Sequence, residues 1–233
     1  MQPFQALYRL FIGPARRSFS TGSDKMTLEK AYVGMQCFWG VESSFAKIKG
    51  VRKTRVGYAG GTTVNPTYRN IGDHTEITEV QFDPAVVSYR EILAHFWTKH
   101  DPTKKEPKQY KSAILYVNDD QKAIAEETSK EVEELKRKPL DTYIQKFDKF
   151  YQAENYHQKY WLRGRGGVIH ELGLTDEELV DSYLATKLNA YLAGYKDFSE
   201  LDALAKEHNI PTELVESIRR IANEGGDPRN CHA

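Results

Sequence analysis

The spacing of apolar and polar positions changes repeatedly along the chain, and each change indicates a new secondary-structure element. Loose alternation predicts strands at 30–33, 51–58, 75–82 and 112–117. From Phe38 the apolar side chains recur every three or four residues, which predicts a helix that Gly50 closes. A second helical pattern begins at Ser88 after an Asp-Pro turn.

The order of these elements is strand, helix, strand, strand, helix, strand. A long charged helix is expected at 119–137, followed by a strand or extended segment at 143–150. This order matches the ferredoxin-like, split βαβ pattern. We therefore predict an α+β fold with a mainly antiparallel or mixed sheet and helices packed on it.

The rest of the chain has only helical patterns. Thr175 and Glu178 form a capping-box signature that opens a helix expected to run to Leu192. Ser199 and Thr212 are expected to cap two further short helices, the last of which ends at Gly225-Gly226. Residues 166–233 are thus predicted to be a helical extension with a mobile end.

Composition narrows the class of protein. The chain has 233 residues, no net charge and two cysteines, and its mean hydropathy is −0.65. These values exclude a disulfide scaffold, argue against bulk attraction to nucleic acid, and leave no apolar run long enough to span a membrane. Charge is nonetheless uneven, because residues 1–25 carry a net +3, residues 26–169 a net +4, and residues 170–233 a net −7. The extension is therefore acidic, and the chain divides into three segments.

The first segment resembles a targeting sequence. Residues 1–23 contain no acid, and Arg9, Arg16 and Arg17 alternate with apolar residues before a Ser-rich stretch. This pattern is typical of an organellar transit peptide, so we expect residues 1–25 to direct the chain to the mitochondrion. A disordered tail is the alternative, and a start at Met26 would leave the protein in the cytoplasm.

Candidate chemistry begins at Cys37, which lies where a strand gives way to a helix. Free N–H groups and the helix dipole at such a position stabilise a thiolate. A lone cysteine is nevertheless more often a buried, inert residue. Phe38 and Trp39 follow directly and would ordinarily be core aromatics.

A series of motifs in one order decides between these interpretations. They are Gly34-Met35-Gln36-Cys37-Phe38-Trp39-Gly40-Val41-Glu42, Val56-Gly57-Tyr58-Ala59-Gly60-Gly61, Asn65-Pro66-Thr67-Tyr68, His74-Thr75-Glu76, Phe82-Asp83-Pro84, His100-Asp101-Pro102-Thr103, Gln109-Tyr110-Lys111-Ser112 and Ala153-Glu154-x-Tyr156-His157-Gln158-x-Tyr160. Together they resemble the A-type peptide methionine sulfoxide reductases across residues 30–162. The resemblance makes 26–165 the catalytic domain.

The resemblance implies reduction of methionine S-sulfoxide, free or in proteins, without a metal or organic cofactor. Cys37 would be the nucleophile and Glu76 the acid near the sulfoxide oxygen. Tyr58 and Tyr110 would donate hydroxyl groups to that oxygen. A pocket for the substrate methyl group would be formed by Phe38 and Trp39. Attack would leave a sulfenic acid that a thioredoxin-like thiol donor reduces, and we expect a monomer that binds neither nucleic acid nor membrane.

Pattern alone suggests plainer roles for several of these residues. Glu76 lies in an alternating strand and would face solvent, while Tyr58 and Tyr110 would be half-buried packing residues. His157 is expected to be a structural hydrogen-bonding residue. A non-catalytic relative that binds methionine sulfoxide or protein is the main alternative function, and acyl transfer is a weaker one. Retention of the cysteine together with the glutamate and both tyrosines favours the reductase.

Three departures from the family pattern are visible. Gln36 occupies a position where the family usually has glycine, and Lys105 stands where it usually has an aspartate near the second tyrosine. Glu106 is the candidate replacement for that carboxylate, and loss of the carboxylate is the alternative. The glycine-rich cysteine tail is replaced by the helical extension, so any internal resolving thiol must be Cys231, with direct reduction by an external thiol as the alternative.

Overall fold

The computed structural model describes residues 27–225 and contains a six-stranded sheet in the order β5-β4-β1-β3-β2-β6. The strands are β1 (Glu29–Gly34), β2 (Val51–Ala59), β3 (Thr75–Phe82), β4 (Ala113–Tyr116), β5 (Tyr143–Lys146) and β6 (Phe150–Gln152). Neighbouring strands are antiparallel except for β4 and β5, which are parallel. The central order β4-β1-β3-β2 confirms the predicted split βαβ arrangement and the α+β class.

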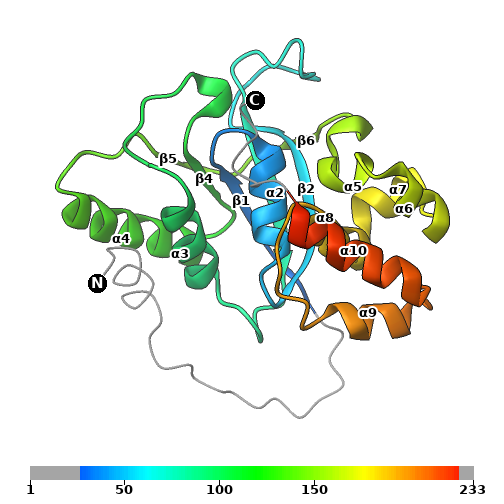
Figure 1. The fold of residues 1–233 in the computed structure, drawn as a ribbon. Helices are drawn as coiled ribbons and strands as arrows, with labels where there is room; N and C mark the ends of the chain where they lie inside the picture. Colours follow the sequence, from blue (N-terminus) through cyan, green and yellow to red (C-terminus); the bar gives the residue numbers. More distant parts are fainter. Residues whose placement is uncertain (1–26, 226–233) are drawn as a thin grey trace.

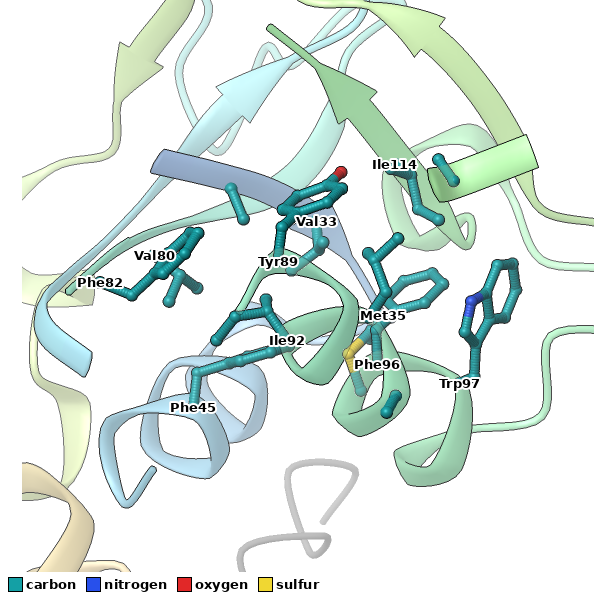
Figure 2. Close-up of a cluster of buried hydrophobic side chains, with 14 of the residues drawn as sticks. Val33, Met35, Phe45, Val80, Phe82, Tyr89, Ile92, Phe96, Trp97 and Ile114 are labelled. Atoms are coloured by element: carbon teal, nitrogen blue, oxygen red, sulfur yellow. The ribbon is translucent and has the colours of Figure 1, made fainter. Parts of the chain in front are cut away.

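Three helices cover one face of this sheet (Figure 1). Helix α2 (Phe38–Ala46) lies over β2 and β3, α3 (Tyr89–Lys99) lies over β1, and α4 (Asp119–Lys136) packs beside α3. The side chains between helices and sheet form the main core (Figure 2). Labelled members of this core are Val33, Met35, Phe45, Val80, Phe82, Tyr89, Ile92, Phe96, Trp97 and Ile114.

The opposite face of the sheet is also covered. Tyr32, Ile77 and Leu115 form a second apolar cluster there, against which Phe147 and Phe150 pack. The interpretation that Glu76 faces solvent is also wrong, because its side chain points to the face that the helices cover and its exposed fraction is 2%. Alternation marks which face a side chain occupies, but it cannot show whether that face is covered.

The helical extension has its own apolar core. The extension comprises α6 (Gly166–Leu172), α7 (Asp176–Asp181), α8 (Tyr183–Leu192), α9 (Leu201–Glu207) and α10 (Thr212–Glu224). Helix α5 (Tyr160–Arg163), which precedes the expected start at residue 166, packs into the same core. Helix α8 contacts both α2 and β2, so the extension packs directly against the helix that follows Cys37 and the strand that carries Tyr58 (Figure 1).

Several helix ends differ from the prediction. The capping box at Thr175 is present, but the expected single helix to Leu192 breaks at Ser182, whose hydroxyl caps α8 by accepting the N–H of Ala185. Ser199 and Thr212 do not cap helices, because Glu200 and Pro211 occupy the N-cap positions of α9 and α10. Helix α10 ends before Gly225, as expected.

A buried ion pair joins the catalytic helix to the chain leading into the extension. The ammonium nitrogen of Lys159 lies 2.8 Å from a carboxylate oxygen of Glu42, and both side chains are fully buried. The Lys159 ammonium also donates to the carbonyl oxygen of Thr54. Removing one partner of such a pair leaves an uncompensated buried charge. This pair is therefore a stability determinant of the contact between the two parts.

We expect Lys159→Met to lower the free energy of unfolding by about 3 kcal/mol, because Glu42 would remain buried without its cation. Chemical denaturation followed by circular dichroism measures the change. The matched control is Arg219→Met, which breaks an exposed pair with Asp202 and should cost less than about 1 kcal/mol. Equal losses for the two variants would contradict the assignment.

Candidate active site

Cys37 occupies the N-cap position of α2 and is partly exposed. Gln36 before it has a φ of 70°, in the left-handed region that glycine adopts without strain. The side chain of Gln36 donates a 2.7 Å hydrogen bond to Glu106, which helps to hold this turn. The left-handed backbone at Gln36 thus explains why glycine would suit this position. The turn leads into α2, whose first N–H groups lie beside its N-cap residue, Cys37.

Glu76 lies beside the start of this helix, on strand β3. One carboxylate oxygen accepts the N–H of Phe38 at 3.1 Å, and the other accepts the side-chain amide of Gln109 at 2.9 Å. Burial raises the pKa of Glu76 to about 7, although both hydrogen bonds act to lower it. Near neutral pH this carboxyl can therefore carry a proton beside the first N–H group of the helix that Cys37 caps.

Tyr110 lies in the short 3-10 helix η1 (Lys108–Tyr110), whose Gln109 side chain bonds both Glu76 and the Tyr110 hydroxyl. Its hydroxyl oxygen lies 3.5 Å from that of Tyr68 and 3.3 Å from the Gln109 amide nitrogen. The hydrogen bond to Tyr68, partial burial and the charges of Glu76 and Cys37 raise the pKa of Tyr110. The hydroxyl therefore stays protonated and remains a donor at physiological pH.

Tyr58 lies directly opposite Glu76 in the pairing of β2 with β3. Its side chain is fully buried, and its hydroxyl donates a 2.8 Å hydrogen bond to Glu154. Glu154 also accepts the N–H of Tyr68 at 3.0 Å. Burial raises the pKa of Tyr58, as do the hydrogen bond and charge of Glu154. The structure thus brings Tyr58 to the site while its hydroxyl proton is directed at a neighbouring carboxylate.

Phe38 and Trp39 extend the site with an aromatic surface. Phe38 is buried, with its ring centroid 6.1 Å from that of Tyr58. Trp39 is partly exposed and stacks on Tyr160 at 3.9 Å between ring centroids, with the planes 7° apart. Trp39 also donates its indole N–H to Nδ1 of His157 at 3.0 Å.

His157 therefore has the structural hydrogen-bonding role expected from sequence. Burial lowers its pKa, so the ring is neutral at pH 7 and Nδ1 can accept the indole proton. Its ring also lies 5.1 Å from that of Phe38 between centroids. One histidine thus positions both aromatic residues of the motif.

Glu106 has taken a position close to the cysteine turn. Besides Gln36, its carboxylate contacts the ammonium of Lys104, whereas Lys105 is exposed. Glu106, the candidate replacement for the missing aspartate, is thus tied to the residue that precedes Cys37.

Sequence reasoning gave no role to three residues that hold this site together: Gln109, Tyr68 and Glu154. Each lies inside a motif, but nothing in the hydrophobic pattern distinguishes it from a surface polar residue. Cys231 lies outside the described residues. Within 27–225, no group of three or more His, Cys, Asp or Glu side chains could hold a metal ion, and no helix is long and apolar enough to cross a membrane.

A family model described as "Peptide methionine sulfoxide reductase" matches residues 29–185. The chain belongs to this family. As a peptide methionine sulfoxide reductase it is an oxidoreductase that acts on methionine sulfoxide. The matched residues extend beyond the catalytic domain expected at 26–165 and end within α8.

Relatives of known type agree with this assignment. The chain is 43% identical over 211 residues to a peptide methionine sulfoxide reductase of Drosophila melanogaster, a match covering 88% of this chain and 85% of the relative. A match of this length necessarily includes much of the helical extension. The enzyme MsrA of Methanothermobacter thermautotrophicus is 45% identical over 144 residues, covering 57% of this chain and 85% of the relative.

Solved structures agree as well. Methionine sulfoxide reductase A of Corynebacterium diphtheriae is similar with a TM-score of 0.54 and 31% identity, covering 60% of this chain and 77% of that one. The A-type identification made from the motifs and the α+β fold predicted from the element order are thereby confirmed.

Proposed function

We propose that this reductase acts on the S epimer of methionine sulfoxide, free and in proteins, with Cys37 as its nucleophile. The observation that carries the proposal is the placement of a buried, protonatable carboxyl at the start of the cysteine helix. Glu76 accepts the N–H of Phe38, the residue after Cys37, and its pKa is raised to about 7 by burial. A sulfoxide sulfur becomes a good electrophile only when its oxygen receives a proton, which this carboxyl supplies.

The chemistry is a two-electron exchange between two sulfur atoms. The Cys37 sulfur attacks the sulfoxide sulfur while Glu76 transfers its proton to the oxygen. The thiolate attack forms a bond between the two sulfur atoms and leaves Glu76 as a carboxylate. The protonated oxygen then moves as a hydroxyl group from the substrate sulfur to the Cys37 sulfur: the substrate S–O bond and the S–S bond break, and a Cys37 S–O bond forms. Methionine leaves, and Cys37 is left as a sulfenic acid. The substrate sulfur is reduced and the cysteine sulfur is oxidised by the same two electrons.

Tyr110 and Tyr58 are proposed to donate hydrogen bonds to the oxygen as charge develops on it. The arrangement around Tyr110, with Gln109 and Tyr68 beside it, supports an available donor. Tyr58 reaches the oxygen by exchanging its bond to Glu154 for one to the substrate. Phe38 and Trp39 are proposed to receive the substrate methyl group, with Trp39 held by His157 and Tyr160.

The proposal is tested by offering each epimer of a blocked methionine sulfoxide with dithiothreitol as reductant. Turnover of the S epimer alone supports it. Binding without turnover would support a non-catalytic module, and hydrolysis of a thioester or ester substrate would support acyl transfer.

Reduction of the sulfenic acid requires a second thiol, and we propose Cys231 followed by a thioredoxin-like donor. Cys231 is the only other cysteine of the chain. It attacks the sulfenic sulfur, a Cys37–Cys231 disulfide forms and water leaves. Closing so long a loop costs only modestly more entropy than closing a short one.

Cys231→Ser is therefore expected to complete one turnover at the parent rate and then stall with thioredoxin as donor. Mass spectrometry after stoichiometric substrate should find a Cys37–Cys231 disulfide in the parent. A persistent sulfenic acid in the parent, or unchanged thioredoxin-driven turnover in the variant, would make this a one-cysteine enzyme.

We also propose that residues 1–25 direct the chain to the mitochondrion, from the acid-free, arginine-containing pattern of that segment. A fluorescent fusion of the full chain should enter mitochondria, and a fusion starting at Met26 should stay in the cytoplasm. Identical distributions would disprove a targeting role.

A further inference from the structure

A cavity of about 770 Å³ lies between the catalytic fold and the helical extension. Its walls come from the turn after α2, from α3, and from α8 with the segment that follows it, all of which can be followed in Figure 1. None of the residues assigned to the reductase site lines it. Its volume is in the range of sites for small organic ligands.

The cavity is rich in cations. Its lining includes five lysines, Lys47, Lys49, Lys99, Lys187 and Lys196. Lys187 is neutralised by Glu200, 3.0 Å away. For the other four, no carboxylate of residues 27–225 lies within 4.0 Å of the ammonium group. The cavity therefore has an excess of positive charge.

Three acidic residues, Glu91, Asp197 and Glu200, also line the cavity. Glu91 accepts from Ser88 in the capping box of α3, and Asp197 accepts the N–H of Ser199. Glu200 accepts the hydroxyl of Tyr183 in addition to its pair with Lys187. Hydrogen bonds from Ser199 and the charges of Lys187 and Lys49 lower the pKa of Asp197, so this carboxylate offsets part of the lysine charge. Three carboxylates against five lysines still leave the lining with a net positive charge.

Lys47 and Lys99 form the most unusual part of this surface. Lys47 is the C-cap of α2 and Lys99 is the last residue of α3, positions where the helix dipole favours a cation. The helix dipoles explain why a lysine is favourable at each of these two positions. They do not explain why both lysines line the same cavity. Burial, the charge of Lys99 and contact with it lower the pKa of Lys47 to about 8.

His95 also lines the cavity, but it carries no negative charge that could offset the charges of the lysines. Its pKa is held well below the ordinary value, first by burial and then by the charges of Lys47 and Lys99, so the ring is neutral. Its Nε2 atom is 3.2 Å from the hydroxyl of Ser44. A bound dianion would remove the repulsion between the two ammonium groups.

The rest of the wall is apolar and aromatic. Ile48, Val87 and Tyr191 line it, and the ring of Tyr195 lies under the Lys47 ammonium at 4.5 Å. Such a surface suits the carbon skeleton of a ligand rather than a bare ion. A phosphate monoester has a charge of −1.5 to −2 at pH 7 and three acceptor oxygens, which matches two adjacent lysines.

We propose that this cavity binds a small organic phosphate, with its phosphate group between Lys47 and Lys99 and its apolar body against Tyr191 and Tyr195. The ligand touches α2, α3 and the segment after α8 at once. Its binding therefore strengthens the contact between the catalytic fold and the extension.

The test is isothermal titration calorimetry of the full chain with phenyl phosphate. Inorganic phosphate and phenol are titrated separately as the charged and apolar halves of that probe. We expect phenyl phosphate to bind at least tenfold more tightly than either half. Lys47→Gln and Lys99→Gln should each weaken binding at least tenfold and leave methionine sulfoxide reduction unchanged.

Lys122→Gln is the matched control, because Lys122 lies on α4 outside the cavity, in a weak pair with Glu126. It should bind the probe as the parent does. Melting temperatures without ligand identify unfolded variants, and the exposed position of Lys99 keeps its variant folded. Equal affinity in all variants, equal affinity for inorganic phosphate, or competition with methionine sulfoxide would each overturn the proposal.

Discussion

Replacing Cys37 by serine is expected to abolish methionine sulfoxide reduction. A serine hydroxyl at the same N-cap position is a far weaker nucleophile than a thiolate and cannot form the sulfenic acid. The fold should persist, because the side chain is partly exposed and the substitution exchanges one small group for another. Single-turnover reduction of each epimer, measured by chromatography of the methionine product, checks the result.

Cys231→Ser is the matched control for this experiment. Both variants lose one thiol, but only Cys37→Ser should lose the first turnover. Reduction near the parent rate in Cys37→Ser, in protein with unchanged circular dichroism, would assign the chemistry to another residue.

Glu76→Gln is expected to slow the chemical step by about 10²–10⁴-fold, the usual contribution of a positioned general acid. The amide keeps the shape of the carboxyl and can still accept the N–H of Phe38, so substrate affinity should change little. Rapid-quench measurement of the first turnover separates the chemical step from recycling. An unchanged rate would mean that the proton comes from elsewhere, with Glu106 the next candidate.

The same variant should change the pH profile. The pKa of Glu76 is about 7, so the fraction of parent enzyme with a protonated acid falls as the pH rises through 7. The parent rate relative to that of Glu76→Gln should therefore decline between about pH 6 and 8. A constant ratio over this range would contradict the acid role.

Glu76→Gln is expected to be more stable than the parent at high pH, although it is less active. Because the folded pKa of Glu76 lies above its ordinary value of 4.5, folding favours the protonated form. The free energy of unfolding is therefore lowered progressively from about pH 4.5 to 7, and the full cost, about 3 kcal/mol, applies above that window. Glu76→Gln removes this cost, so we expect it to be more stable than the parent at pH 8 and similar at pH 4.

The sequence alone was sufficient for the element order and for the position of the cysteine. Period changes predicted each central strand and the helix that starts at Phe38, because local spacing records which side chains face a core. The motifs then identified the family, which the comparisons confirm. Helix ends were predicted less well. Ser182 interrupts the expected long helix and caps α8 through a hydrogen bond that spacing does not record, and α9 begins after Glu200 without a side-chain cap.

The environment of Glu76 was decided only in the tertiary structure. Its burial depends on α2 and on the segment around Gln109, whose groups bind both of its carboxylate oxygens. These partners lie far away in sequence, so an alternating strand predicts a solvated acid where the fold has a carboxyl with a raised pKa.

The same separation in sequence applies to the rest of the site. Tyr58 meets Glu154 across 96 residues, and Trp39 meets His157 across 118. The sequence determined which groups the chain possesses, their order and the helix on which the thiol lies. Only the folded chain determined which carboxyl is buried, which hydroxyl is already bonded and which ring holds the tryptophan. Burial and hydrogen bonding depend on neighbours in space, and a local pattern contains no information about those neighbours.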